Sequence, residues 1–281
     1  MSEFDPAGHD QPRSGHPPLR GRTILVTRAR TQSEDITTQL EALGAAVIHF
    51  PTIEFVPPNT WAPLDASIAR IREYDWIVFT SANGVHFFFS RLSELRQESA
   101  AEVLSATIVC AIGPATARAI EEAGAVASVV ASDSKAEGAL TAIIHHVGGD
   151  EKVKGLRFLI PRARVARETL PAGLRRLGAH VDAVDTYQTV KPDVHPTGVV
   201  RLFKENSIDA ITFTSSSTVS NFAELAGLTD LSGLLSTTLA ACIGPITAET
   251  AASYGLKRIV QPELYTAAAL VERIVESIGE K

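Results

Sequence analysis

An internal repeat constrains the fold of this chain more than any other feature. Residues 24–30 read ILVTRAR, and residues 158–164, 134 positions later, read FLIPRAR. In both copies, apolar residues at helical spacing follow and end at a glycine, Gly44 in the first copy and Gly178 in the second. Each copy therefore predicts a strand, a helix that ends at a glycine, and another strand, so we expect one folding unit to occur twice.

Two later segments repeat as well. Residues 76–85 read WIVFTSANGV and match AITFTSSSTV at 210–219, while AIGPATA at 111–117 matches CIGPITA at 242–248. All four segments have the pattern of a buried strand that leads into a helix, and in the second pair glycine is the N-cap and proline the first helical residue. Short apolar strands that alternate with helices predict parallel sheets covered on both faces. The expected fold class is α/β, with two doubly wound parallel-sheet domains.

The expected domain boundaries follow from two segments, 52–56 and 184–190, that alternate like exposed strands and have no helix of their own. Residues 1–21 are rich in proline, glycine and charge, and we expect a disordered tail there. The remaining chain is then divided into three parts. These are a first, discontinuous domain of residues 22–51 plus 191–281, a two-stranded hinge ribbon of residues 52–57 and 185–190, and a second, inserted domain of residues 58–184.

Composition excludes several classes of function. The chain has 281 residues, 45% of them apolar, and a formal net charge of −6, which argues against a general affinity for nucleic acids or anionic lipids. It has no apolar run of about 18 residues and no signal peptide, so we expect a cytoplasmic protein that spans no membrane. A monomer is expected.

No cofactor or metal is expected either. The chain has no GxGxxG motif after a strand and no GxxxxGK[ST] motif, which argues against NAD and ATP. Its histidines lack partners at metal-ligand spacing, and its two cysteines, Cys110 and Cys242, lie in apolar strands, where we expect buried thiols in a reducing compartment.

The repeated turns are candidates for an anion site. They follow the carboxyl ends of parallel strands, where open α/β sheets bind ligands, and helix N-termini there suit carboxylates. Arg28 and Arg162 follow the first strand of each copy, and an arginine can hold a carboxylate with two hydrogen bonds. The competing interpretation is that the turns only cap helices and the arginines are solvated surface charges. Arg30 and Arg164 are expected to be such surface charges.

These residues resemble one family, the uroporphyrinogen III synthases. The resemblance is carried by VTR at 26–28, FTS at 79–81 and 213–215, DTYQT at 185–189 and IGPITA at 243–248, and it runs from about residue 23 to residue 274. It implies two flavodoxin-like domains joined by a two-stranded ribbon, with the active site in the cleft between them.

The resemblance also implies a reaction. The substrate would be hydroxymethylbilane, which loses its terminal hydroxyl to give an azafulvene. The substituted carbon of the last pyrrole attacks this azafulvene, and a spiro-pyrrolenine forms and recloses with ring D inverted to give uroporphyrinogen III. Cyclisation without an enzyme gives the unreversed isomer, so the protein would act mainly by folding a flexible chain into one reactive geometry.

The expected site residues come from the motifs and the resemblance together. Tyr187 matches the ribbon tyrosine of the family and is the candidate for protonating the departing hydroxyl; the competing interpretation is a ribbon residue whose ring packs on the core. At 238–239, where some relatives have a lysine, this chain has Thr-Leu, so no lysine contact is expected. The residues expected to bind substrate are Arg28, Thr80, Ser81, Asn83, Gly113, Thr116, Arg162, Ser215, Ser216, Gly244 and Thr247.

Two alternative functions, neither of them catalytic, remain. A non-catalytic two-lobed protein that closes on a small anion or a tetrapyrrole would need the same duplicated domains, and a regulatory module could keep the fold of an enzyme family without its activity. An assay with hydroxymethylbilane that separates the III and I isomers discriminates among the three.

Overall fold

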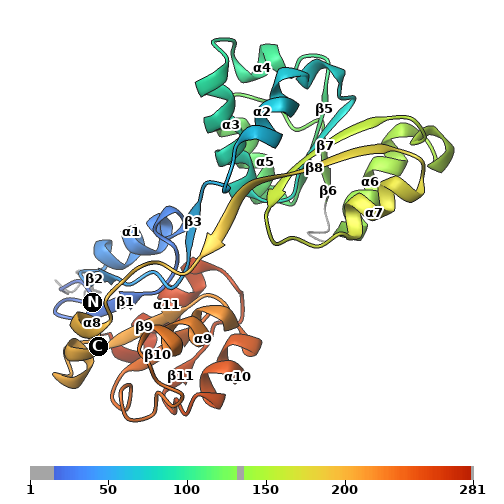
Figure 1. The fold of residues 1–281 in the computed structure, drawn as a ribbon. Coiled ribbons are helices and arrows are strands. Elements are labelled where there is room, and N and C mark those ends of the chain that lie inside the picture. The colour runs from blue at the N-terminus through green and yellow to red at the C-terminus, as the bar shows by residue number, and fades with distance from the viewer. Residues whose placement is uncertain (1–15, 132–135, 280–281) are drawn as a thin grey trace, which may run out of the picture. The chain divides into compact units, whose positions relative to one another are not determined.

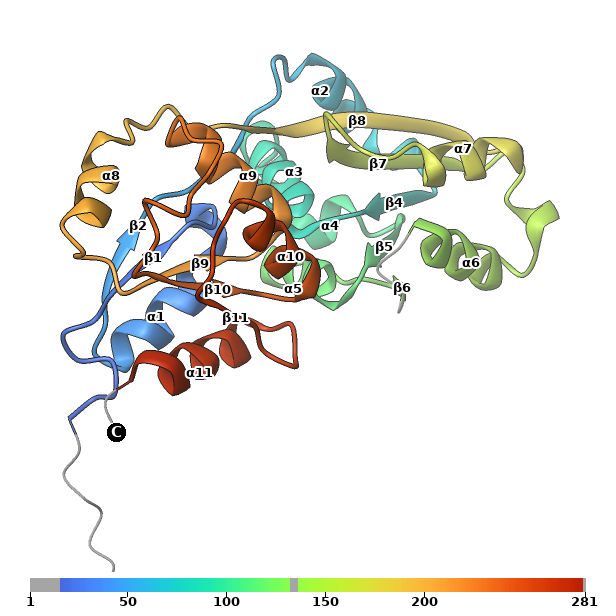
Figure 2. The ribbon, with the colours of Figure 1, turned by 90° about the horizontal axis from the view of Figure 1, so that it is seen from below.

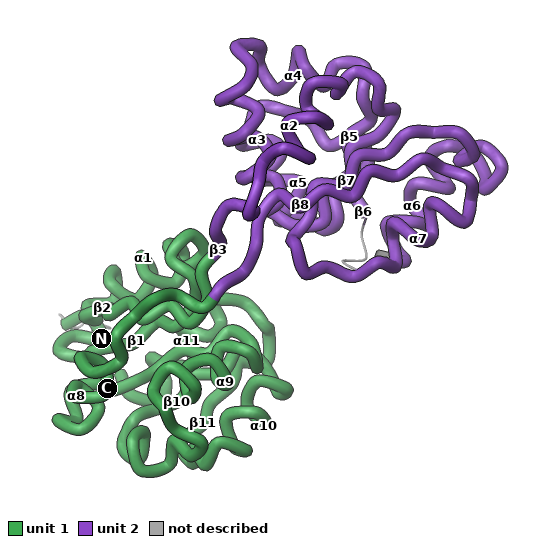
Figure 3. Tube along the Cα trace, in the orientation of Figure 1, with its two compact units in different colours: residues 1–54, 191–281 green, residues 55–190 purple. Residues whose placement is uncertain are grey.

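The computed structural model describes residues 16–131 and 136–279, in two compact units. Unit 1 consists of residues 1–54 and 191–281, and unit 2 of residues 55–190 (Figure 1, Figure 3). Unit 1 is therefore discontinuous, because the whole of unit 2 is inserted between its second and third strands.

Unit 1 has a five-stranded sheet in the order β11-β10-β9-β1-β2. In chain order this is 2-1-3-4-5, the order of flavodoxin-like sheets, and its strand pairs are parallel. The strands are β1 (Thr23–Val26), β2 (Ala46–His49), β9 (Ala210–Phe213), β10 (Leu239–Cys242) and β11 (Ile259–Val260). The helices are α1 (Glu34–Ala42), α8 (Thr197–Lys204), α9 (Ser216–Leu225), α10 (Pro245–Ser253) and α11 (Ala267–Ile278).

Unit 2 has a six-stranded sheet in the order β3-β8-β7-β4-β5-β6. Leaving out the edge strand β3, the arrangement is that of unit 1, with β7 and β8 in the places of β1 and β2. The predicted fold class, two doubly wound parallel-sheet domains, is confirmed. The strands are β3 (Glu54–Val56), β4 (Trp76–Phe79), β5 (Ile108–Ile112), β6 (Val129–Ala131), β7 (Arg157–Ala163) and β8 (His180–Val190). The helices are α2 (Ala62–Ala69), α3 (Ala82–Leu95), α4 (Ala100–Val103), α5 (Pro114–Glu122), α6 (Ala136–Val147) and α7 (Thr169–Arg176).

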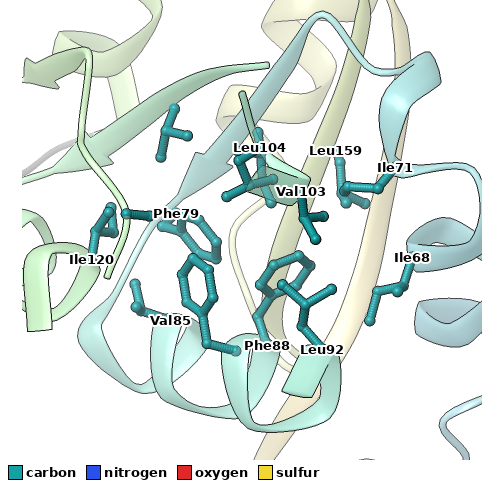
Figure 4. Packing of buried hydrophobic residues seen from close by; sticks show 14 of the residues in the cluster. Ile68, Ile71, Phe79, Val85, Phe88, Leu92, Val103, Leu104, Ile120 and Leu159 are labelled. Carbon is teal, nitrogen blue, oxygen red and sulfur yellow. The ribbon is translucent and has the colours of Figure 1, made fainter. Parts of the chain in front are cut away.

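Helices cover both faces of each sheet, and the alternation of strand side chains decides which core each residue enters. In β4, Ile77 and Phe79 pack under α2, α3, α4 and α5, while Trp76 and Val78 pack under α6 and α7. Figure 4 shows Phe79 against Phe88 of α3, with ring centroids 5.3 Å apart. Unit 1 repeats these layers, with α8, α9 and α10 on one face and α1 and α11 on the other (Figure 2).

The prediction of a disordered tail to residue 21 is wrong for its last six residues. Leu19 is fully buried in the core beneath α1 and α11, and its N–H donates to the carbonyl of Leu43 at 2.9 Å. One leucine among prolines and charges is too little to predict this packing from sequence. The remainder of the predicted tail, residues 1–15, lies outside the described residues.

The connection from unit 1 into β3 also differs from the expected ribbon at its first residue. Thr52 is fully buried, its N–H donates to the carbonyl of Thr27 at 3.0 Å, and its own carbonyl accepts from the Asn221 side chain at 3.3 Å. Because these bonds join Thr52 to the end of β1 and to α9, Thr52 belongs to unit 1, and the strand itself begins at Glu54. Its partner β8 starts at His180, five residues before the predicted ribbon.

Among the helices of the described residues, none is both long and apolar enough to cross a lipid bilayer.

Candidate functional site

The strand order reverses once in each unit, and open α/β sheets bind ligands beyond the carboxyl ends of the strands at such a point. In unit 2 this point lies between β7 and β4, where Arg162 and Thr80 are found. In unit 1 it lies between β1 and β9, and Arg28 and Thr214 follow these strands. The repeat thus puts an arginine and a Thr-Ser turn at each reversal point.

Ser81 and Tyr187 are brought together in unit 2. Ser81 is the N-cap of α3, and its Oγ accepts the N–H of Gly84 at 3.1 Å. The same Oγ lies 3.1 Å from the hydroxyl of Tyr187 on β8, and either oxygen can be the donor. A candidate acid and a candidate carboxylate-binding turn therefore share one hydrogen bond at the start of a helix.

The ring of Tyr187 is held by aromatic neighbours. It stacks on Phe87 of α3, with centroids 5.6 Å apart and 11° between the planes, and meets Phe55 of β3 edge-on at 5.8 Å. The side chain is only 7% exposed. The ring thus packs on unit 2, as expected for a ribbon residue whose ring lies on the core. Its hydroxyl points to the start of α3, so the packing fixes the position from which the phenol would act.

A pocket of about 220 Å³ lies at the reversal point of unit 2. Thr80, Arg162, Arg167 and Thr169 line it, with Glu137 of α6 at one side. Two guanidinium groups and two hydroxyls beside one carboxylate make a site that favours an anion. Of these residues the sequence analysis proposed Thr80 and Arg162.

Arg167 and Thr169 were missed by the sequence analysis. Arg167 lies in the segment between β7 and α7, where unit 1 has no arginine at the matching position, and Thr169 is the first residue of α7. The repeat, which guided the choice of residues, therefore gave no reason to select them. A run of three arginines in six residues, Arg162, Arg164 and Arg167, was the only sequence feature that could have indicated the pocket.

Arg162 is paired on one side of its guanidinium group. Its Nη1 forms an ion pair of 2.5 Å with Oε1 of Glu168, the residue before α7, while its Nε is buried and has no hydrogen-bond partner among the described residues. The Arg162 side chain is 15% exposed and that of Glu168 58%. A buried donor without an acceptor is costly, so an anionic group in the pocket would bind it favourably.

Unit 1 holds its arginine differently. Arg28 is half-buried, and its Nε donates to Oε1 of Gln32 at 3.3 Å. Burial lowers the pKa of the Arg28 guanidinium, and the negative charge of Asp35 opposes this shift. Desolvation of this kind strengthens an interaction with an anion that reaches the group. Arg28 remains a candidate contact.

The serines of unit 1 are partly used within the protein. Ser215 is the N-cap of α9 and its Oγ accepts the N–H of Thr218 at 3.3 Å, while a second contact of 2.9 Å joins it to Ser217. Ser216 donates to the carbonyl of Ile246 at 3.2 Å and so joins the starts of α9 and α10. Both are half-buried and remain proposals as substrate contacts.

The remaining candidates lie at helix starts. Gly113 caps α5 with a positive φ of 82°, and its N–H donates to the carbonyl of Ala131, so its own amide is used within the protein. Thr116 and Thr247, in the first turns of α5 and α10, are only 3% and 5% exposed, which restricts a ligand to the small accessible part of each. Asn83, in the first turn of α3, is half-buried, and Gly244 caps α10.

The two cysteines, Cys110 and Cys242, offer no reactive thiol. Burial raises the pKa of both cysteine thiols to about 12, in keeping with the buried thiols expected from the sequence. Within residues 16–131 and 136–279, His, Cys, Asp and Glu side chains nowhere gather in a group that could hold a metal ion.

Fold and site define a class of protein: a two-unit α/β protein with a flavodoxin-like sheet in each unit and an arginine and a helix start at each reversal point. A family model described as uroporphyrinogen-III synthase HemD matches residues 34–272. The uroporphyrinogen-III synthase of Synechococcus elongatus is 37% identical over 237 residues, which cover 83% of this chain and 86% of that protein. The chain belongs to the uroporphyrinogen-III synthase family, and the family resemblance found in the sequence is confirmed.

Further relatives agree with this membership. The porphyrin biosynthesis protein HemD of Ruminiclostridium josui is 33% identical over 262 residues, which cover 93% of this chain and 50% of that longer protein. A crystal structure of a mutant uroporphyrinogen III synthase from the extremely thermophilic bacterium Thermus thermophilus superposes with a TM-score of 0.56 at 17% identity, covering 91% of this chain and 98% of that one. The Helicobacter pylori synthetase gives 0.55 at 16% identity, covering 91% of this chain and 99% of that one. At such identities the two structures support the fold alone.

Proposed function

We propose that this chain cyclises hydroxymethylbilane to uroporphyrinogen III, with loss of water and inversion of ring D. The observation that carries the proposal is the family match over residues 34–272, because it includes all of unit 2 and most of unit 1. The substrate loses a hydroxyl and a hydrogen as water, the last pyrrole attacks the resulting azafulvene, and the spiro intermediate fragments and recloses with that ring reversed.

Tyr187 is the proposed acid for the first step. Because Ser81 Oγ already accepts an N–H from Gly84, its own proton is available to Tyr187, and the phenolic proton then remains for the departing hydroxyl. Water leaves with that proton, and the phenolate takes up the one that the substrate gives off. The positive end of α3, acting through Ser81, favours the anionic phenolate during this exchange.

The same proposal assigns the carboxylates of the substrate to donors within each unit. In unit 2 these are the pocket of Arg162, Arg167 and Thr80 together with the helix starts, and in unit 1 Arg28 and the starts of α9 and α10. Fixing several carboxylates limits the conformations of a flexible bilane, which is how positioning alone can select one isomer.

Incubation of the protein with freshly prepared hydroxymethylbilane, followed by oxidation and separation of the porphyrin isomers, tests the proposal. An enzyme yields mainly the III isomer at a rate proportional to protein concentration. A binding protein without activity leaves only the spontaneous I isomer while still binding tetrapyrrole in calorimetry, and an inactive regulatory module gives the I isomer whether or not it binds. Either of these last two outcomes rejects the proposal.

A further inference from the structure

Strand β8 contains a bulge directly before Tyr187. It pairs with β7 in regular parallel register up to the pair of Arg162 and Asp185, but the next residue of β7, Ala163, lies opposite Tyr187. One step along β7 therefore corresponds to two steps along β8, and Thr186 is the extra residue. An extra residue of this kind changes the face of the sheet on which the following side chain lies.

The alternation of side chains along β8 shows the effect of the bulge. Before it, Ala183 packs against the core beneath α6 and α7, and Val184 packs in the core beneath α2 and α3. In a regular strand Tyr187 would share the face of Ala183, because side chains repeat every two residues. Tyr187 instead stacks on Phe87 of α3, on the face of Val184. The bulge therefore turns the phenol toward α3.

The hydroxyl of Thr186 makes a hydrogen bond within the bulge. Thr186 is fully buried, and its Oγ1 donates to the carbonyl of Val184 at 3.2 Å. After the bulge, the N–H of Arg164 donates to the carbonyl of Tyr187 at 2.9 Å, so the backbone of Tyr187 is bonded as well. Because a buried hydroxyl without a partner is costly, the bond of Thr186 stabilises the conformation in which it forms.

Unit 1 does not have this bulge in the strand that corresponds to β8. That strand is β2, which pairs with β1 in consecutive, regular register. At the repeat offset of 134 residues, Thr52 matches Thr186, and its hydroxyl donates to the carbonyl of Thr27 at 3.3 Å. Ile53 then stands where unit 2 has Tyr187. In these two strands the bulge thus accompanies the tyrosine and is missing from the copy with isoleucine.

We propose that the bulge at Thr186 presents the phenol of Tyr187 to Ser81, and that the Thr186 hydroxyl is a positioning group for this phenol. The proposal rests on the proposed function, because it concerns the acid of that reaction. Thr186 itself does not touch the substrate, since it is fully buried. It acts by holding Tyr187 on the α3 side of the sheet, where the phenolic oxygen lies 3.1 Å from Oγ of Ser81.

Thr186→Val tests the hydroxyl, because valine is close to threonine in shape and cannot donate a hydrogen bond. In the isomer assay we expect kcat to fall by about 3- to 10-fold with KM nearly unchanged, since the carboxylate contacts are kept. Thr186→Ser keeps the hydroxyl and should keep most of the kcat. If the valine variant does not fold, Thr186→Ala gives the same comparison.

Thr107→Val is the matched control for Thr186→Val. Thr107 is another buried threonine of unit 2, and its hydroxyl donates to the carbonyl of Tyr74 at 3.3 Å. The two valine variants should therefore lose similar stability in urea unfolding, because each loses one buried hydrogen bond to a carbonyl. Only Thr186→Val should lose kcat.

Two further measurements separate positioning from a general loosening of unit 2. In the Tyr187→Phe background, Thr186→Val should have no further effect on kcat, because the phenol through which it acts is gone. With isotope-labelled tyrosine, the NMR signal of the Tyr187 ring carbon that bears the hydroxyl should shift in Thr186→Val in the same direction as in Ser81→Ala. This signal is identified by its loss in Tyr187→Phe, and Thr107→Val should leave it in place.

Several outcomes overturn the proposal. An unchanged kcat and an unchanged tyrosine signal in Thr186→Val would show that the hydroxyl does not position Tyr187. An equal loss of kcat in Thr107→Val would assign the effect to loosening of unit 2, and additive losses with Tyr187→Phe would mean that Thr186 acts by another route. If the unchanged protein forms no III isomer, the proposed function is rejected instead, and the NMR comparison still decides whether Thr186 positions Tyr187.

Discussion

The hydroxyl of Tyr187 lies 3.1 Å from Oγ of Ser81, the N-cap of α3, although 106 residues separate the two in the chain. The sheet order makes this possible, because β8 and β4 are separated only by β7. A phenol in this position is connected to the N–H of Gly84 through one serine. The two Thr-Ser turns therefore differ. Ser81 contacts a tyrosine from another strand, whereas Ser215, the capping serine of unit 1, contacts Ser217 and Thr218 in its own turn.

Ser81→Ala tests whether this serine positions Tyr187. Loss of an N-cap should lower the free energy of unfolding by about 1 kcal/mol, and loss of the bond to Tyr187 should lower kcat by about 3- to 20-fold. Ser99→Ala is the control, because Ser99 caps α4 of the same unit and is not among the residues proposed to bind substrate. We expect a similar loss of stability in both variants, measured by urea unfolding, and the larger loss of kcat in Ser81→Ala. Equal kinetic effects would contradict a positioning role.

Arg162→Gln tests the pocket of unit 2. The change removes a guanidinium group whose buried Nε has no hydrogen-bond partner among the described residues, so an anionic group of the substrate should lose a charge-assisted hydrogen bond. We expect KM to rise by about 10-fold or more, with a smaller change in kcat. Arg164→Gln is the control, because Arg164 is exposed and donates to Gln188 at 3.3 Å. Steady-state kinetics in which the control has the larger effect would place the carboxylate elsewhere.

The fold could be predicted from the sequence because the repeat shows the pattern of most strands and helices twice. The strand at 76–79 and its copy at 210–213 are both buried throughout, and their following serines both cap helices. Most of the candidate site residues were predicted from the repeat, whereas Tyr187 was predicted from the family resemblance carried by residues 185–189. Arg167 has no counterpart in unit 1, so a search guided by the repeat omitted it.

Long-range packing explains what else was missed. The contact between Tyr187 and Ser81 depends on the order of the strands in the sheet. This order cannot be predicted from the alternation of strands and helices along the chain. The burial of Leu19 depends on a hydrogen bond to Leu43 and on the space beneath α1 and α11. Neither a propensity nor a local motif in residues 16–21 indicates that space.

Two truncations test the correction at the N-terminus. Removal of residues 2–15 should leave the melting temperature nearly unchanged, because that stretch has little apolar surface. Removal of residues 2–20 deletes Leu19, which is fully buried, and should cost about 2 kcal/mol or more, as should Leu19→Ala. Val165→Ala, at a side chain 93% exposed, is the control. Equal melting temperatures for the two truncations would show that Leu19 contributes nothing to the core.

Tyr74 should make stability depend on alkaline pH. Its pKa is raised, first by burial and then by the hydrogen bond of 2.5 Å that its hydroxyl donates to Asp182. Because the folded pKa lies above the ordinary value of about 10, the contribution of Tyr74 is complete below that pH and is lost as the pH rises through the folded pKa. In urea unfolding, the advantage of the unchanged protein over Tyr74→Phe should therefore be constant up to about pH 9 and shrink as the pH rises above about 10. An advantage that stays constant or grows at the higher pH would contradict this prediction.

Tyr187→Phe tests the proposed acid, and it keeps the ring that packs on Phe87 and Phe55. Stability should change by no more than about 1 kcal/mol, the value of one hydrogen bond, while kcat falls by about 10- to 1000-fold if the phenol protonates the departing hydroxyl. The product should remain mainly the III isomer, because folding of the bilane determines ring inversion and a single proton does not.

The double variant of Tyr187 and Ser81 separates the two roles. If Ser81 acts only through Tyr187, then Ser81→Ala should have almost no further effect on kcat in the Tyr187→Phe background, although it still lowers stability as an N-cap. Additive losses of kcat would mean that Ser81 touches the substrate independently. If Tyr187→Phe keeps full turnover and an unchanged KM, the phenol is a packing residue of β8, and the chemistry rests on the positioning of carboxylates alone.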